Sequence, residues 1–227
     1  MAVARRAATD SPTNTGATAT RQRLLDAAVD RFIETGYFAT KLTDITSRAN
    51  VTTGAFYHHF ASKEAVATAI VEQGWSKVIA EVTRCLNNPA PGLERVIVTT
   101  FQISDLMKRD KSVGIANHLA QAFGQLSIDG RQSFHEHVSR FIGRVADALI
   151  GTELREGISP TQVASLVWIS LQGCHLLSDP LMDNGSHVEQ LHLSWRVGLP
   201  SMVTPRALPH YEQFTTDLAG QYTNAVW

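Results

Sequence analysis

The sequence has few of the residues that form disulfide scaffolds or thiolate metal centres. Its 227 residues include two cysteines, Cys85 and Cys174, which lie far apart and outside any CxxC or CxxH motif. This usage argues against a disulfide framework and against a cysteine-based zinc site. It favours a reducing compartment, and we expect a cytoplasmic protein.

Long hydrophobic runs are also absent. No apolar stretch approaches the roughly 20 residues of a membrane span, and the N-terminus lacks the apolar segment of a signal peptide. We expect neither secretion nor membrane insertion. Residues 1–20 consist largely of Ala, Thr, Ser and Gly. With almost nothing large to bury, they predict a flexible arm, whose Arg5 and Arg6 either contact DNA or remain solvated.

No excess of one charge is present. Twenty Lys and Arg residues face twenty-one Asp and Glu residues, which leaves a formal charge of −1. Any contact with nucleic acid must therefore come from a local surface rather than from a basic chain. A hydrophobic content of 44% is ordinary for a chain with a core and excludes collagen-like and disordered classes.

Signatures of catalysis and metal binding are missing as well. The sequence has no nucleophile elbow, glycine-rich phosphate loop or paired-carboxylate motif. The nine histidines are scattered, and no pair has the i, i+4 spacing that places two imidazoles on one helix face. The two closest pairs are His58 with His59 and His135 with His137. His118 and His175 are isolated in the sequence. We expect no enzyme activity, metal or cofactor.

Helical periodicity runs through the chain. Apolar residues recur at one-turn spacing before Gly36, which suits a left-handed helix end. The stripe comprises Leu24, Leu25, Ala28, Val29, Phe32 and Ile33. After Lys63 no period-2 strand pattern occurs, and Pro, Asp-Gly and Asn-Gly turns separate helical segments. The sequence predicts an all-α fold.

A helix-turn-helix follows the first stripe. Thr43 is the expected N-cap of a short helix that stops at Asn50, a residue that tolerates the left-handed conformation. Thr52 or Thr53 then caps a second helix, over residues 54–60, and Ser62 caps a third. Two short helices joined by a tight turn form the motif that places a recognition helix in the major groove.

Residues 23–66 resemble the N-terminal DNA-binding domain of the TetR family of bacterial transcriptional repressors. They read RLLDAAVDRFIETGYFATKLTDITSRANVTTGAFYHHFASKEAV. The resemblance implies a DNA-binding domain over residues 21–66 and an effector-binding and dimerisation domain over residues 67–227. Thr53 and His58 depart from common family residues and bear on which operator is read.

The resemblance also implies which residues contact DNA. We add Gly54, because small residues at the start of a recognition helix allow close approach to the groove. The candidate DNA-binding residues are Thr40, Thr43, Thr52, Thr53, Gly54, Tyr57, His59 and Lys63. The partner is a palindromic double-stranded operator, which a homodimer reads through two recognition helices. Apolar residues of the late helices would form that dimer: Leu166, Ile169, Leu176, Leu177, Leu191, Leu193, Trp195 and Val197.

A second resemblance narrows the family to its γ-butyrolactone receptor branch. The matching segments are SFHEHVSRFIGRVADAL, SLVWISLQG and LHLSWRVGLPSMVTPRALPHYEQF. The branch binds a small, mostly apolar lactone in a central cavity, and binding lowers the affinity for DNA. Where the branch has a pocket glutamine, tryptophan and threonine, this chain has Gly74, His137 and Cys174. We therefore expect another effector, such as a furan, a butenolide or an antibiotic intermediate, or a pseudo-receptor.

Helical spacing offers candidate ligand contacts. Phe134, His137 and Phe141 share one face of an expected helix, and Val167, Leu171 and Cys174 share a face of a later one. These faces suit either an apolar pocket or plain core, and Trp168 suits a cavity edge or a subunit interface. The candidate ligand-binding residues are Phe134, His137, Phe141, Trp168, Leu171 and Cys174.

Taken together, these patterns predict a ligand-responsive repressor that controls secondary-metabolite genes. The alternative is a pseudo-receptor, or a module that sequesters a ligand or a partner regulator without responding to lactones. Loss of DNA binding would separate the sequestering module from the repressor.

Overall fold

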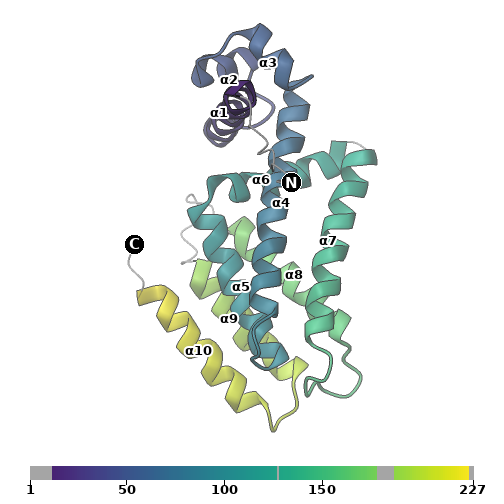
Figure 1. Cartoon of the computed structure of the whole chain (residues 1–227). Helices are drawn as coiled ribbons and strands as arrows, with labels where there is room; N and C mark the ends of the chain where they lie inside the picture. Colours follow the sequence, from purple (N-terminus) through teal and green to yellow (C-terminus); the bar gives the residue numbers. More distant parts are fainter. Residues whose placement is uncertain (1–11, 127, 178–186, 225–227) are drawn as a thin grey trace, which may run out of the picture. The chain divides into compact units, whose positions relative to one another are not determined.

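The fold is entirely helical over the residues that the structure, a computed structural model, describes: 12–126, 128–177 and 187–224. These ranges contain ten helices and no strand, as the sequence predicts (Figure 1). The helices are α1 (Pro12–Thr35), α2 (Leu42–Ala49), α3 (Thr53–His59), α4 (Lys63–Leu86), α5 (Gly92–Arg109), α6 (Lys111–Leu126), α7 (Ile128–Ala148), α8 (Pro160–Leu177), α9 (His187–Met202) and α10 (Leu208–Asn224).

The chain divides into two compact units, residues 1–73 and 74–227. The boundary falls within α4, beyond residue 66, where the sequence analysis ended the DNA-binding domain. Helix α4 therefore contributes residues to both units.

The first unit begins earlier than expected. Helix α1 starts at Pro12, so residues 12–20 are helical and do not form part of an arm. Proline is favoured at the first position of a helix, where its missing N–H has no intrahelical partner to lose. Residues 1–11, with Arg5 and Arg6, lie outside the described part of the chain. The core of this unit buries apolar residues of all four helices: Leu24, Leu25, Phe32, Ile45, Phe56 and Val66.

Local caps fix the short helices. The N-cap of α2 is Lys41, not Thr43, and its backbone N–H donates to the Asp44 carboxylate at 2.8 Å. Asn50 ends α2 in the left-handed region, with φ of 51°, as expected. Thr52 caps α3, since its hydroxyl accepts from the N–H of Ala55 at 3.1 Å. The tight turn between α2 and α3 is therefore built from local chemistry.

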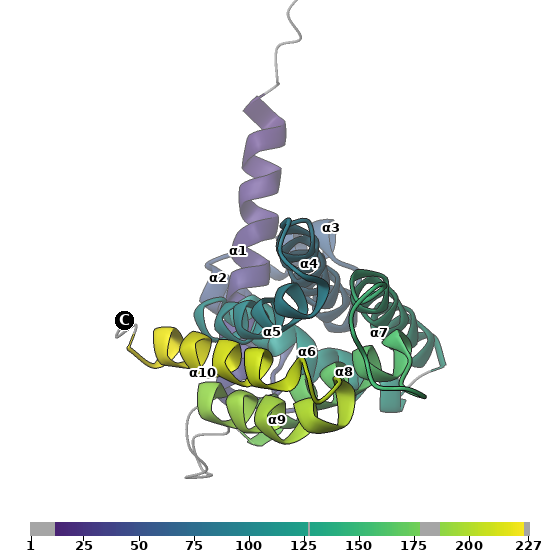
Figure 2. The same cartoon turned by 90° about the horizontal axis from the view of Figure 1, so that it is seen from below.

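The second unit is built around α5, which packs against α6, α7, α8, α9 and α10. Helices α9 and α10 lie side by side in both views of the ribbon (Figures 1 and 2). A buried hydrogen bond joins α9 to the centre, where the Trp195 indole N–H donates to the Thr100 hydroxyl at 2.9 Å. The core of this unit thus includes one satisfied polar pair among apolar side chains.

Five large apolar side chains of α8 and α9 remain exposed: Leu166, Ile169, Leu176, Leu193 and Val197. Two others expected on the dimer surface, Leu191 and Trp195, are instead buried in the core. Successive positions on one helix point in different directions, so only one stripe of α9 faces outward. The side chain of Leu177 lies outside the described residues. Within the described ranges, none of the helices has the length and hydropathy to span a membrane.

Candidate DNA-binding surface and effector cavity

Helix α3 presents small and polar residues to solvent. Thr52, Thr53, Gly54 and Tyr57 are exposed, and Tyr57 has an exposed fraction of 58%. On its opposite side, Phe56 is fully buried, and it anchors the helix to the unit. A helix with this division can approach a base-pair edge without unfolding its core. His59 is only partly exposed, whereas Thr43 on α2 is exposed.

Ion pairs hold α2 against α1. The Arg48 guanidinium lies 2.7 Å from the Asp30 carboxylate and 3.2 Å from that of Glu34. Both pairs are solvent-exposed, so each contributes little stability. They link α1 to the helix that precedes the recognition helix.

Two of the expected DNA-contacting residues, Thr40 and Lys63, form hydrogen bonds within the first unit. The Thr40 side chain is 1% exposed, and its hydroxyl donates to the Gly36 carbonyl at 2.7 Å. The Lys63 ammonium donates to the carbonyls of Tyr37 and Thr40, at 2.7 and 2.8 Å. It also lies over the Tyr37 ring, 4.4 Å from the centroid, and partial burial lowers the pKa of Lys63. Both side chains tie together the loop between α1 and α2.

Replacing Lys63 by methionine should therefore destabilise the first unit. The substitution keeps the apolar stem but leaves two carbonyls without their donor, which costs about 1–3 kcal/mol. Chemical denaturation of the purified variant measures this loss. Replacing the exposed Thr43 by alanine serves as the control and should leave stability within about 0.5 kcal/mol of the wild type. Equal stability of Lys63→Met and wild type would contradict the structural role.

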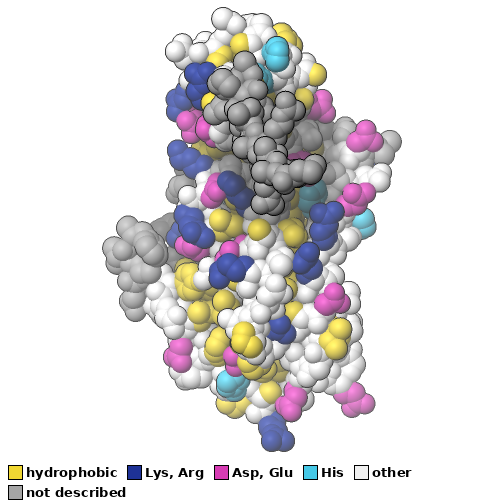
Figure 3. Space-filling model, in the orientation of Figure 1, with side chains coloured by type: hydrophobic (Ala, Val, Ile, Leu, Met, Phe, Trp, Pro, Cys, Tyr) yellow, Lys and Arg dark blue, Asp and Glu magenta, His cyan; other side chains and the backbone are white. Residues whose placement is uncertain are grey.

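The surface contains further exposed groups that the motif did not single out. Phe38 is 71% exposed, and Lys41 is exposed at the start of α2. The sequence pattern does not predict the exposure of this aromatic side chain, and a single exposed apolar residue is not by itself evidence of a contact surface. On the face seen in Figure 3, Lys and Arg side chains are mixed with Asp and Glu. Neither sign of charge dominates this face, in keeping with the near-zero net charge of the chain.

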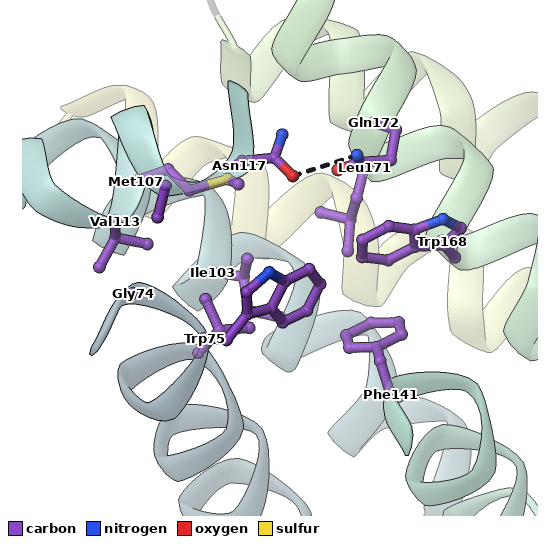
Figure 4. A pocket seen from close by; sticks show the side chains of 12 residues that line it. Gly74, Trp75, Ile103, Met107, Val113, Asn117, Phe141, Trp168, Leu171 and Gln172 are labelled. Atoms are coloured by element: carbon purple, nitrogen blue, oxygen red, sulfur yellow. Dashed lines mark hydrogen bonds between the residues drawn. The ribbon is translucent and has the colours of Figure 1, made fainter. Parts of the chain in front are cut away.

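The second unit has a small, partly open apolar cavity between α4, α5, α6, α7 and α8. Side chains of Trp75, Phe141 and Trp168 turn toward one another there (Figure 4). The cavity measures about 20 Å³, which is room for a single water molecule. Its lining is Gly74, Trp75, Val78, Ile103, Met107, Val113, Ala116, Asn117, Phe141, Trp168, Leu171 and Gln172.

Polar groups of the cavity are neutral and mostly donors. Gln172 donates its side-chain N–H to the Asn117 carbonyl at 3.2 Å, drawn as the dashed line in Figure 4. The Nδ2 of Asn117 and the indole Nε1 of Trp75 are buried without a hydrogen-bond acceptor. An unpaired buried donor is energetically costly. No lining residue carries a charge.

Three of the six candidate ligand-binding residues line the cavity, and the other three do not. Phe141, Trp168 and Leu171 line the cavity. Phe134 lies behind it, with its ring 6.4 Å from that of Trp168. His137 is also behind the lining, where its ring stacks on Trp75 at 4.9 Å and its Nδ1 lies 2.7 Å from the Ser133 carbonyl.

Cys174 does not line the cavity either. Its thiol is buried one helical turn beyond Leu171, and burial raises its pKa. A buried thiol with a raised pKa stays protonated and unreactive at neutral pH. Cys174 is therefore a packing residue of α8 in this structure.

Gly74 allows α4 and α6 to approach closely. A Cβ atom at Gly74 would lie far inside the contact distance of the Ala116 Cβ and 3.3 Å from the Ser112 carbonyl oxygen. A side chain at position 74 therefore requires α6 to move away. Position 74 is thus a point of close contact between α4 and α6.

Helical spacing in the sequence did not predict several residues of the cavity lining. Trp75, Asn117, Ile103, Met107 and Val113 come from α4, α5 and α6, whose apolar faces do not reveal which other helices they meet. Two features of the sequence could have indicated them. Trp75 is a large aromatic residue beside a helical glycine, and Asn117 is a polar residue within an apolar stripe.

A wider hollow of about 580 Å³ lies among α5, α9 and α10. Charged side chains border it, and one of these, Asp105, pairs with Arg109 at 3.1 Å. Burial raises the pKa of Tyr222 at its edge to about 12. This hollow differs from the cavity in that α4 does not form part of its lining.

A helix-turn-helix unit joined by one helix to an all-helical unit with an internal cavity defines a class of DNA-binding regulators. Residues 24–70 match the model of the bacterial regulatory proteins of the tetR family. The A-factor receptor protein of Streptomyces griseus is 30% identical over 208 residues, covering 89% of this chain and 71% of that protein. The chain belongs to the TetR family, whose members are transcriptional regulators and not enzymes.

Solved structures agree with this assignment. A γ-butyrolactone receptor (ArpA-like protein) superposes with a TM-score of 0.74 at 26% identity, covering 91% of this chain and 99% of that one. CprB of Streptomyces coelicolor, in complex with its biological operator sequence, gives a TM-score of 0.69 at 26% identity, with 90% and 98% of the two chains covered. Regulators of this family bind operator DNA as dimers and respond to small molecules.

Proposed function

We propose that this protein is a repressor that binds a palindromic operator as a homodimer in the cytoplasm and dissociates from it when a small molecule enters the cavity of the second unit. One observation carries the proposal: a chain with an exposed recognition helix also has a neutral apolar cavity with two unpaired buried donors. The alternative is a pseudo-receptor that binds DNA without responding to lactones.

The lining selects the chemistry of the effector. Trp75 and Trp168 provide flat apolar surfaces, and the free N–H groups of Trp75 and Asn117 favour acceptor oxygens. With no lining charge, a carboxylate or an amine would lose its hydration without compensation. The effector is thus a neutral, largely apolar molecule with a carbonyl or ring oxygen, as in lactones, furans and butenolides. The names of the related γ-butyrolactone and A-factor receptors support the same class.

The size of the cavity supports a coupled mechanism. At about 20 Å³ it cannot hold such a molecule until side chains or helices move. Trp75 belongs to α4, and α4 also contains residues of the DNA-binding unit. A ligand that displaces Trp75 favours a second conformer, and a hundredfold loss of operator affinity requires about 2.7 kcal/mol of differential binding. This link through α4 favours the cavity over the wider hollow.

The exposed stripe of α8 and α9 is the proposed dimer surface. It presents Ile169 and Val197, exposed at 62% and 69%, together with Leu176 and Leu193. A stripe of this size is costly to leave in water and is buried when two copies meet about a two-fold axis. Sedimentation of Ile169→Asp should show monomers, since a charge at the centre of an apolar interface opposes association.

The proposed function is tested by gel-shift titration on DNA from upstream of the gene and its neighbours. γ-Butyrolactone, butenolide and furan compounds are added in parallel. Release by one class supports the repressor and names the effector chemistry. Binding that no compound disturbs supports the pseudo-receptor, and absence of binding to any upstream DNA contradicts both in favour of a sequestering module.

The variant Asn117→Leu should separate effector binding from DNA binding. The substitution removes one buried donor from the cavity. It should weaken effector binding by about 1–3 kcal/mol, or roughly 5- to 150-fold in the dissociation constant. Operator affinity of the unliganded protein should stay unchanged. Fluorescence titration of the cavity tryptophans measures the first quantity, and gel shift measures the second. Unchanged effector affinity would place the effector elsewhere.

A further inference from the structure

Three histidines from separate helices gather beside the α6–α8 contact. His118 of α6 and His175 of α8 are 57 positions apart in the sequence, and their Nε2 atoms lie 3.1 Å apart. His187 at the start of α9 is buried, with its ring centroid 6.0 Å from that of His175. This cluster is outside the cavity lining and has no part in the proposed repressor mechanism.

The orientation of the first two rings distinguishes two kinds of contact. Their centroids are 4.6 Å apart and their planes are inclined by 39°. A head-on N–H···N bond of this length would place the centroids about 5.4 Å apart. Two imidazoles that bind one metal ion at about 2.0–2.1 Å, with an angle of roughly 100° between them, have centroids about 4.8 Å apart. The hydrogen-bonded rings have a centroid separation nearer the value for two ligands of one ion than the value for a linear hydrogen bond.

We infer that His118 and His175 form a binding site for a divalent late transition-metal ion. Imidazole nitrogens select copper, nickel and zinc over magnesium and calcium, and copper binds most tightly in this series. Among the described residues, no group of three His, Cys, Asp or Glu side chains is arranged to hold a metal. The ion therefore takes two protein ligands and fills its remaining positions with water.

The position of the pair gives the site a consequence. The adjacent residue Asn117 and the nearby Gln172 join the same two helices by their hydrogen bond at 3.2 Å. An ion held by His118 and His175 adds a second link between α6 and α8, both of which line the cavity. Metal binding should therefore stabilise the second unit, and this expectation does not depend on the identity of the effector.

The test uses the full chain without an affinity tag, after removal of metals with a chelator. Cu²⁺, Ni²⁺ and Zn²⁺ are titrated by calorimetry into wild type, His118→Asn, His175→Asn and the control His135→Asn. His135 is an exposed histidine of α7, outside the cluster. Wild type and control should bind one ion per chain with the same affinity, and each cluster variant should bind at least about tenfold more weakly.

Two further measurements test whether both histidines bind the ion. Electron paramagnetic resonance of the Cu²⁺ complex should show two coordinated imidazole nitrogens. Added metal should raise the thermal unfolding temperature of the wild type but not that of His118→Asn or His175→Asn. His118 is exposed, so its variant keeps the fold. Binding that is equal in His118→Asn and wild type, a spectrum without two coordinated imidazoles, or no binding by wild type would overturn the site.

Discussion

Replacing Tyr57 by alanine should weaken operator binding about 5- to 150-fold, which corresponds to about 1–3 kcal/mol. The side chain is 58% exposed, and its ring packs at its edge against the fully buried Phe56, with the two centroids 5.6 Å apart. Removing the ring takes a large contact surface and an O–H donor from the recognition helix. Anisotropy titration with a fluorescent operator measures the loss.

Two controls make the Tyr57 result specific. Tyr57→Phe removes only the hydroxyl and should lose less affinity than Tyr57→Ala. Unfolding of Tyr57→Ala by urea should match the wild type within about 0.5 kcal/mol, because an exposed side chain contributes little to the core. Operator affinity equal to wild type in Tyr57→Ala would remove α3 from the DNA-contacting surface.

Replacing Gly74 by alanine should lower the free energy of unfolding by a net of about 0–2 kcal/mol. Alanine favours a helix interior by about 1 kcal/mol over glycine, but overpacking costs about 1–3 kcal/mol. Here the added methyl group meets the Ala116 side chain and the backbone of Ser112, so α6 must shift. Chemical denaturation measures the change.

Gly143 provides the matched control. It lies within α7, is exposed, and has no atom within 4 Å of an added Cβ. Gly143→Ala should therefore raise the free energy of unfolding by about 0.5–1 kcal/mol through helix propensity alone. If Gly74→Ala stabilised the protein as Gly143→Ala does, the result would contradict a close contact between α4 and α6 at Gly74.

The sequence predicted the fold class and the DNA-binding motif because both depend on local signals. The apolar stripe before Gly36, the left-handed Asn50 and the Thr52 cap each involve neighbours within one or two turns. The roles of Thr40 and Lys63 were not predictable in this way. Lys63 meets the Tyr37 carbonyl across 26 positions, so its role is set by how α4 packs in its unit.

The residues that line the cavity were likewise only partly predictable from the sequence. Spacing identified Phe141 and Leu171 as members of apolar faces, and both line the cavity. Spacing also grouped His137 and Cys174 with them, although these side chains lie outside its lining. A helix face is wider than the opening it borders, so periodicity selects the face without selecting the residues at the cavity. The contact of His118 with His175 depends on tertiary packing alone.

The central claim is that an effector in the cavity lowers affinity for the operator. The most direct test measures the operator dissociation constant by anisotropy, with and without saturating amounts of a compound whose binding Asn117→Leu weakens. We expect the operator to bind about a hundredfold more weakly in the presence of that compound, equivalent to about 2.7 kcal/mol of coupling. A compound that occupies the cavity yet leaves the operator dissociation constant unchanged would contradict the account.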